Sequence, residues 1–111
     1  MLKWTIAMGL IVSAGISATP QPQDCWPSER RTIAIRLARQ INTAEAAASM
    51  LSRRYVELSA LQVPPPPAGF QVQLSTDGKT YTFSVKDGLE PCHRAVFSDQ
   101  NGVIYTATPL E

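Results

Sequence analysis

Two cysteines and one histidine are the first residues of this 111-residue chain to consider for covalent or metal chemistry. Cys92 and His93 are adjacent, and Cys25 lies far from them in sequence. A metal site needs about four ligands, and the chain has no second histidine. A cysteine nucleophile needs a base held by a third group, and a neighbour on an extended segment points to the opposite face. The Cys92-His93 pair therefore predicts neither a catalytic site nor a metal site.

The two cysteines are instead expected to form a disulfide. Cys25 and Cys92 would close a loop of about 67 residues, and such a crosslink contributes roughly 4 kcal/mol in the chain-entropy model. Geometry raises an objection, because the two Cα atoms must come within about 7 Å and a long predicted helix follows Cys25. The bridge then needs a break in that helix, or a spacer that carries the chain back toward the helix start. A disulfide to another copy or to a partner is the alternative.

Three acidic residues close to predicted turns could reach a calcium ion: Asp87, Glu90 and Asp99. Their spacing matches no calcium-binding loop, so solvated turn residues are expected. The chain also lacks a glycine-rich phosphate loop, a serine-centred nucleophile motif and a His-Glu metal helix. We therefore expect a protein that is not an enzyme, with no catalytic residue, cofactor or metal.

Residues 1–18 have the three parts of a secretory signal peptide. Lys3 supplies the positive start, residues 4–16 are apolar and uncharged, and Ala18 is a small residue just before the expected cut. This apolar run of 13 residues is shorter than the roughly 20 that cross a bilayer core. A retained membrane anchor is the alternative. The leader predicts a periplasmic or extracellular protein that is not inserted in the membrane after cleavage.

The charge balance argues against nucleic acid as a partner. The chain has ten basic and nine acidic residues, for a net charge of +1, and cleavage removes only Lys3 from this balance. The mature chain is thus formally neutral, whereas nucleic-acid binding normally needs a basic surplus. Residues 28–62 carry six arginines against three glutamates. This uneven distribution could pair copies head to tail, although ordinary surface solvation explains it as well.

A long amphipathic helix is predicted over residues 28–62, after an extended proline-rich segment at 19–27. Ser28 is a good N-cap, and no glycine or proline interrupts the chain before Pro64. Apolar residues recur at spacings of three and four, which indicates one buried stripe. Its members are Ile33, Leu37, Ile41, Ala44, Ala48, Leu51, Tyr55 and Leu58. Such a helix would be about 50 Å long, with a break near Asn42 as an alternative.

The rest of the chain predicts a spacer and four antiparallel strands. Residues 63–69 contain four consecutive prolines, which favour a stiff polyproline II conformation. Residues 70–107 alternate between apolar and polar side chains, and Asp77-Gly78 is a strong hairpin turn between the first two strands. A second hairpin is expected around residues 99–102. The prediction is an α+β domain over residues 28–108, in which the helix packs on a four-stranded antiparallel meander.

Two stretches of this domain resemble the type IV pilin and pseudopilin headgroup. Residues 39–45 (RQINTAE) are similar to the helix of short bacterial pilins, and residues 97–105 (FSDQNGVIY) are similar to their final hairpin. The resemblance implies a helix on a four-stranded sheet and a role in assemblies of the cell envelope. The chain departs from the family in its leader, which lacks the prepilin processing motif and carries no acidic residue in its apolar run.

We therefore expect an exported, non-enzymatic, pilin-like structural or protein-interaction component of the cell envelope. A protein partner or self-association is expected, through the exposed helix face or an open sheet edge. The alternative is a free-standing periplasmic binding or inhibitor module, which an apolar pocket between helix and sheet would favour.

Overall fold

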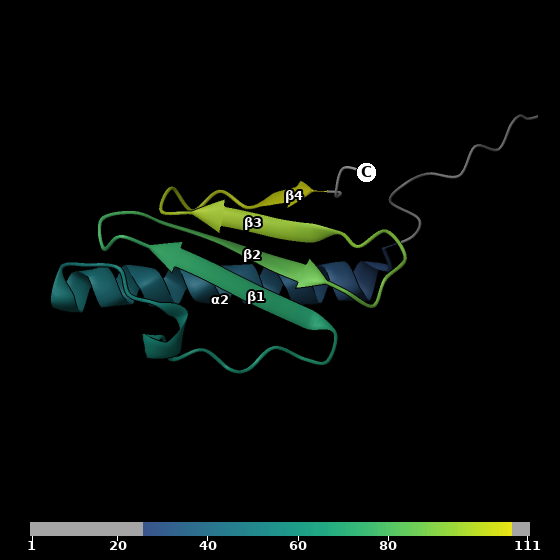
Figure 1. Ribbon diagram of the computed structural model, residues 1–111, viewed down its shortest axis with the longest axis horizontal. Helices are drawn as coiled ribbons and strands as arrows, with labels where there is room; N and C mark the ends of the chain where they lie inside the picture. The colour runs from purple at the N-terminus through teal and green to yellow at the C-terminus, as the bar shows by residue number, and fades with distance from the viewer. Residues whose placement is uncertain (1–25, 108–111) are drawn as a thin grey trace, which may run out of the picture.

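The computed structural model describes residues 26–107, which form one helix packed on a four-stranded antiparallel sheet (Figure 1). The predicted α+β fold and the meander order of the strands are confirmed. The predicted signal peptide at 1–18 and Cys25 lie outside the described residues.

Helix α2 spans Ser28–Ser52 without a break at Asn42. Its cap position is Pro27, whose carbonyl accepts the Arg31 N–H at 3.0 Å, so Ser28 is the first helical residue and not the predicted N-cap. A proline directly before the first turn fits there, because no intrahelical partner exists for its missing N–H.

The helix ends ten residues before the predicted end at Gln62. Arg53 takes the left-handed conformation with φ of 63°, and its N–H bonds to the Ser49 carbonyl at 2.8 Å. The next backbone N–H groups find partners outside the helix. Tyr55 N–H bonds to the Gly78 carbonyl at 2.9 Å, and Val56 N–H bonds to the side chain of Glu45 at 2.9 Å. These tertiary bonds replace the bonds that a longer helix would have made.

Residues 53–69, here called the return segment, run back along the helix toward its first turn (Figure 1). They contain a short 3-10 helix, η4 (Leu58–Ala60), and then the four prolines. At the end of the segment the guanidinium of Arg30 lies 4.5 Å from the centre of the Phe70 ring. The first strand therefore starts beside the start of the helix. The return segment thus carries the chain back toward the helix start, as the predicted Cys25–Cys92 bridge requires.

The sheet consists of β1 (Phe70–Thr76), β2 (Tyr81–Asp87), β3 (Ala95–Asp99) and β4 (Tyr105–Ala107). Neighbouring strands are antiparallel and in sequence order. The β1–β2 turn contains Gly78 with φ of +92°, a conformation that glycine adopts at little cost. Asp77 accepts the backbone N–H groups of Lys79 and Thr80 in the same turn.

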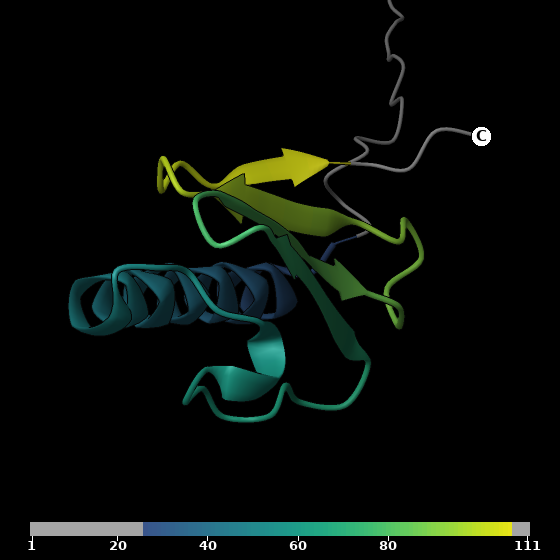
Figure 2. The same ribbon diagram turned by 60° about the vertical axis from the view of Figure 1, so that its left-hand side comes forward.

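The core lies between the inner face of the sheet and two partners. Helix α2 packs on β2 and β3, while η4 of the return segment packs on β1. Figure 2 shows the helix and the return segment on the same side of the sheet. The buried apolar residues are Trp26, Ala34, Leu37, Ala38, Ile41, Leu61, Phe70, Tyr81, Phe83, Val85 and Val96. Removing this apolar surface from water is the main stabilising contribution.

One member of the predicted buried stripe is exposed. Leu51 is 89% exposed, and Met50 beside it is 85% exposed. Figures 1 and 2 show the C-terminal turns of α2 projecting beyond the strands, where the sheet cannot cover them. The prediction placed Leu51 in the core because the helical period continues through it, but the sheet is shorter than the helix.

Candidate interaction surfaces

The outer face of the sheet is the first candidate surface. Its side chains follow the strand register in rows, and Gln73, Ser84, Phe97 and Tyr105 lie side by side in one row across all four strands. Ser75, Thr82 and Asp99 form the neighbouring row. These residues alternate with core residues such as Val85 and Val96, so they stand on the face opposite to the helix.

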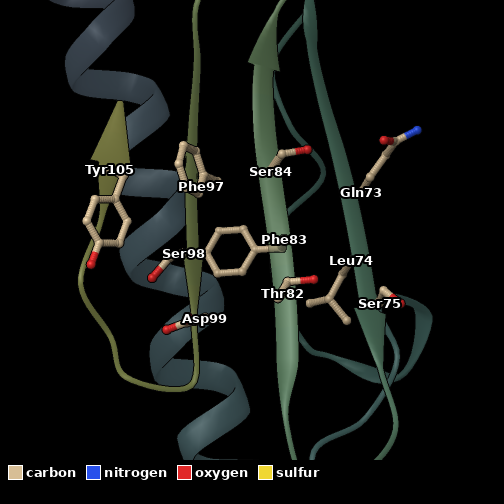
Figure 3. A pocket seen from close by; sticks show the side chains of 10 residues that line it. All are labelled: Gln73, Leu74, Ser75, Thr82, Phe83, Ser84, Phe97, Ser98, Asp99 and Tyr105. Carbon is tan, nitrogen blue, oxygen red and sulfur yellow. The ribbon is translucent and has the colours of Figure 1, made fainter. Parts of the chain in front are cut away.

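A hollow of about 480 Å³ lies over this face (Figure 3). On one side stand Phe97 and Tyr105, whose rings are stacked with centroids 5.4 Å apart and planes 25° apart. Phe97 is 42% and Tyr105 is 50% exposed. Thr82 and Ser84 follow on β2 and Gln73 on β1, and in this view their polar ends point away from the rings (Figure 3). The arrangement offers aromatic surface and neutral hydrogen-bonding groups.

The projecting end of α2 is the second candidate surface. Met50 and Leu51 have the largest exposed fractions among the large apolar side chains of residues 26–107. The exposed residues Arg53 and Arg54 follow them directly, so a small apolar patch has a basic border. We call Met50, Leu51, Arg53 and Arg54 the helix-end patch. Single exposed apolar residues are ordinary on protein surfaces, whereas two adjacent ones at a projecting end can contact a partner together.

A smaller pocket of about 150 Å³ opens between α2, the return segment and β1. It is lined mainly by apolar side chains, among them Leu37, Ile41, Leu61, Val63, Val72 and the first three prolines of the run. This is the kind of pocket between helix and sheet that the sequence analysis associated with a binding module. Its volume is below the range of about 300–1,000 Å³ typical of ligand sites.

A chain of buried and half-buried polar side chains connects α2 to the sheet. The Tyr81 hydroxyl donates to the Asn42 side-chain oxygen at 2.6 Å, and the Asn42 amide donates to Ser98 Oγ at 3.1 Å. Ser98 Oγ in turn donates to the Val103 carbonyl at 2.6 Å. Burial raises the pKa of the Tyr81 phenol to about 12, and the nearby Tyr55 adds to this rise. The Tyr81 phenol therefore stays protonated in the fold, and its hydroxyl can donate the hydrogen bond that joins β2 to α2.

Glu45 is a buried acid that the sequence analysis did not single out. Its side chain is completely buried; Oε1 accepts the Val56 N–H at 2.9 Å, and Oε2 has no hydrogen-bond partner among the described residues. Burial raises the pKa of this carboxyl, and the bond from Val56 offsets part of the rise. The spacing of four residues from Ile41 is the sequence feature that places Glu45 on the buried side of the helix.

Asp87 is buried, contrary to the prediction of a solvated turn residue. Arg30 binds it through two bonds, Nε to Oδ2 at 2.7 Å and Nη2 to Oδ1 at 2.9 Å. The Trp26 indole donates to Oδ2 at 3.1 Å, and the Leu89 N–H donates to Oδ1 at 3.1 Å. Burial acts to raise the pKa of Asp87, but the bonds from Arg30, Leu89 and Trp26 outweigh it and hold the pKa below its usual range.

Glu90 is also buried, and the same prediction was wrong for it. Its carboxylate accepts the Cys92 N–H at 2.7 Å and the Arg94 N–H, so it organises the loop between β2 and β3. Asp99 is half-buried and accepts the Asn101 N–H at 2.9 Å in the last turn. Residues 26–107 contain no cluster of three or more His, Cys, Asp and Glu side chains that could hold a metal ion.

The Cys92-His93 pair lies in this loop, where His93 has φ of 52° and its N–H bonds to the Glu90 carbonyl at 3.1 Å. Cys92 is half-buried. Its predicted partner Cys25 lies outside the described residues, so the disulfide stays a prediction. Trp26, the next residue along the chain from Cys25, bonds to Asp87 at the end of β2. The chain therefore arrives at residue 26 close to the strand end that leads into the Cys92 loop.

Comparison with known proteins found no matching family model, no matching curated protein and no matching solved structure. Among the described residues, no helix combines the length and the apolar character that crossing a membrane requires.

Proposed function

We propose that this chain is an exported, non-enzymatic, pilin-like structural or protein-interaction component of the cell envelope. The observation that carries the proposal is the helix-end patch, where Met50 and Leu51 project from the fold with 85% and 89% exposure. The leader supports export, and the resemblance of residues 39–45 and 97–105 to pilin headgroups supports the envelope assignment.

The partner at the helix-end patch is a protein surface with an apolar recess and an acidic border. The apolar part follows from Met50 and Leu51, because covering their side chains removes apolar area from water. The acidic border follows from Arg53 and Arg54, because these exposed arginines would otherwise lie in the contact without counter-charges. Such a contact is expected to weaken as salt concentration rises.

Site-specific photo-crosslinking in the native envelope tests this proposal. A crosslinker at Met50 is expected to give one adduct of defined mass, and a crosslinker at Thr32, at the other end of α2 and also exposed, is the matched control. Leu51→Lys is expected to abolish the Met50 adduct without changing the circular dichroism spectrum. The proposal is wrong if Met50 gives no adduct, or if Thr32 gives the same one.

The second candidate is a periplasmic binding module, and the apolar pocket between α2 and the return segment favours it. At about 150 Å³ this pocket matches the size of cavities that hold one benzene-sized molecule. NMR titration with benzene tests the idea, with shifts expected for Leu37, Ile41 and Val72. Shifts spread over the whole surface would contradict a defined pocket.

A further inference from the structure

The outer sheet face carries exposed aromatic rings that belong neither to the core nor to the helix-end patch. In a meander, a face without a covering layer usually carries polar side chains throughout. Here the row that crosses all four strands places Phe97 and Tyr105 beside Ser84 and Gln73, and the two rings remain about half exposed. The two rings stack on each other, so their position is held before any ligand arrives.

The charges around the hollow narrow the class of ligand. No lysine, arginine or histidine is among the residues that line the hollow, so a phosphate, sulfate or nucleic-acid backbone would find no cation inside it. The basic residue of this face, Lys86, stands in the next row, outside the lining. Its one carboxylate, Asp99, already accepts the Asn101 N–H at 2.9 Å. The other polar groups are hydroxyls and an amide, which match a neutral ligand rich in hydroxyl groups.

The backbone argues against an extended peptide on this face. Peptides that bind sheets do so at a strand edge, where free N–H and C=O groups continue the ladder. Residues of all four strands line the hollow, and the strands under its centre, β2 and β3, have paired neighbours on both sides. Recognition over these central strands therefore comes from side chains, through the exposed parts of the two rings and the hydroxyl or amide groups.

We propose that the outer sheet face is a binding site for a neutral saccharide chain. The apolar C–H face of one sugar ring packs against Phe97 and Tyr105, and the sugar hydroxyls bond to Gln73, Ser84 and Thr82. Four strands spaced about 4.8 Å apart and two rows about 7 Å apart give a platform roughly 14 Å by 7 Å, which accommodates two sugar rings. The proposal goes beyond the helix-end contact and uses none of its residues.

The test is an NMR titration of the isotope-labelled mature chain with chitotetraose, cellotetraose and maltotetraose, each to millimolar concentration. At least one of the three is expected to give saturable shifts at residues of the two rows. Phe97→Ala is expected to weaken that binding at least tenfold. Because Phe97→Ala could disturb the stacked pair, Thr82→Val serves as a second variant that keeps the shape of the side chain, and a loss of about threefold is expected. Met50→Ala is the control and should leave the affinity unchanged.

Three results would overturn the saccharide site: no shifts with any of the three probes, shifts outside the two rows, or equal binding by wild type and Phe97→Ala. Shifts caused by an extended peptide but by none of the saccharides would also overturn it, in favour of a peptide surface. Because Met50 crosslinking is a separate readout, failure of this proposal leaves the proposed function standing, and the reverse also holds.

Discussion

The carboxyl group of Asp87 connects the start of the helix to the end of β2 and to the loop that follows it. It accepts bonds from Trp26 before the helix, from Arg30 in the first helical turn and from the backbone of Leu89 in the following loop. A buried charge whose partner is removed is strongly destabilising, because the remaining group keeps its desolvation cost. At the scale of single residues, the fold is therefore expected to depend on Asp87.

Replacing Asp87 tests this dependence. Asp87→Ala is expected to lower the free energy of unfolding by about 2–4 kcal/mol, since it removes the acceptor of several bonds at once. Urea denaturation followed by circular dichroism measures the change, and Glu57→Ala at an exposed position is the control. A loss for Asp87→Ala no larger than that of the control would show that the cluster contributes nothing to stability.

Glu45 predicts a specific dependence of stability on pH. Its pKa in the folded chain lies above the ordinary value of 4.5, so the folded state holds the proton more tightly than the unfolded state. The free energy of unfolding should therefore fall as pH rises from about 4.5 through the folded-state pKa, and then level off. The low pKa values of Asp77 and Asp87 act in the opposite sense at lower pH, because their contribution is lost as pH falls below about 3.8.

A difference measurement isolates the Glu45 effect from those of the aspartates. Glu45→Gln keeps an oxygen for the Val56 N–H but cannot ionise. Relative to wild type, its free energy of unfolding is expected to rise between pH 4.5 and pH 7. Glu57→Gln, which is exposed, should show no such trend. A constant difference between Glu45→Gln and wild type across this range would contradict a raised pKa.

At the scale of elements, local patterns predicted the sheet better than the helix end. Alternating residues and the Asp77-Gly78 turn are local features, and they suffice to place β1 and β2. The end of α2 at Ser52 is not local, because residues 53–62 have acceptable helix propensity. The chain leaves the helix there because Glu45 and the Gly78 carbonyl supply partners from elsewhere in the fold.

The residues of the candidate site were also predictable to different degrees, because some of their features are local in sequence and others depend on distant contacts. The buried position of Glu45 is readable from its spacing to Ile41, but that of Asp87 depends on the return of the chain to Arg30. The stacking of Phe97 with Tyr105 follows from the register of the last hairpin, which the sequence placed only within a residue or two. The exposure of Leu51 depends on the relative lengths of helix and sheet, and the spacing of apolar residues along the helix does not contain this information.

Substitutions at Gly69 and Gly88, whose backbones are hydrogen-bonded to each other, test the conformation at the end of the return segment. Gly69 has φ of +91°, and a Cβ there would lie 2.5 Å from the Leu89 side chain; a Cβ at Gly88 would meet its nearest atom at 3.5 Å. Gly69→Ala is expected to cost about 1–2 kcal/mol from its backbone conformation alone. Gly88→Ala is expected to be close to neutral. Thermal unfolding of both variants measures this, and equal losses would show that Gly69 has no special conformation.

At the scale of the whole molecule, the two ends of α2 have different roles. The first turn is tied to the end of β2 through Arg30 and Asp87, whereas the last turns project with Met50 and Leu51 exposed. A Cys25–Cys92 bridge would reinforce the tied end, next to the Trp26–Asp87 bond. An exported chain can keep such a bridge, because the compartments outside the cytoplasm are oxidising.

The most direct test of the account is the intact mass of the chain purified from its native cell envelope, measured with and without reductant. The account predicts a chain that lacks residues 1–18 and is about two mass units lighter before reduction than after it, as one internal disulfide requires. A full-length chain with both thiols reduced would contradict export, and with it the proposed place of this protein in the cell envelope.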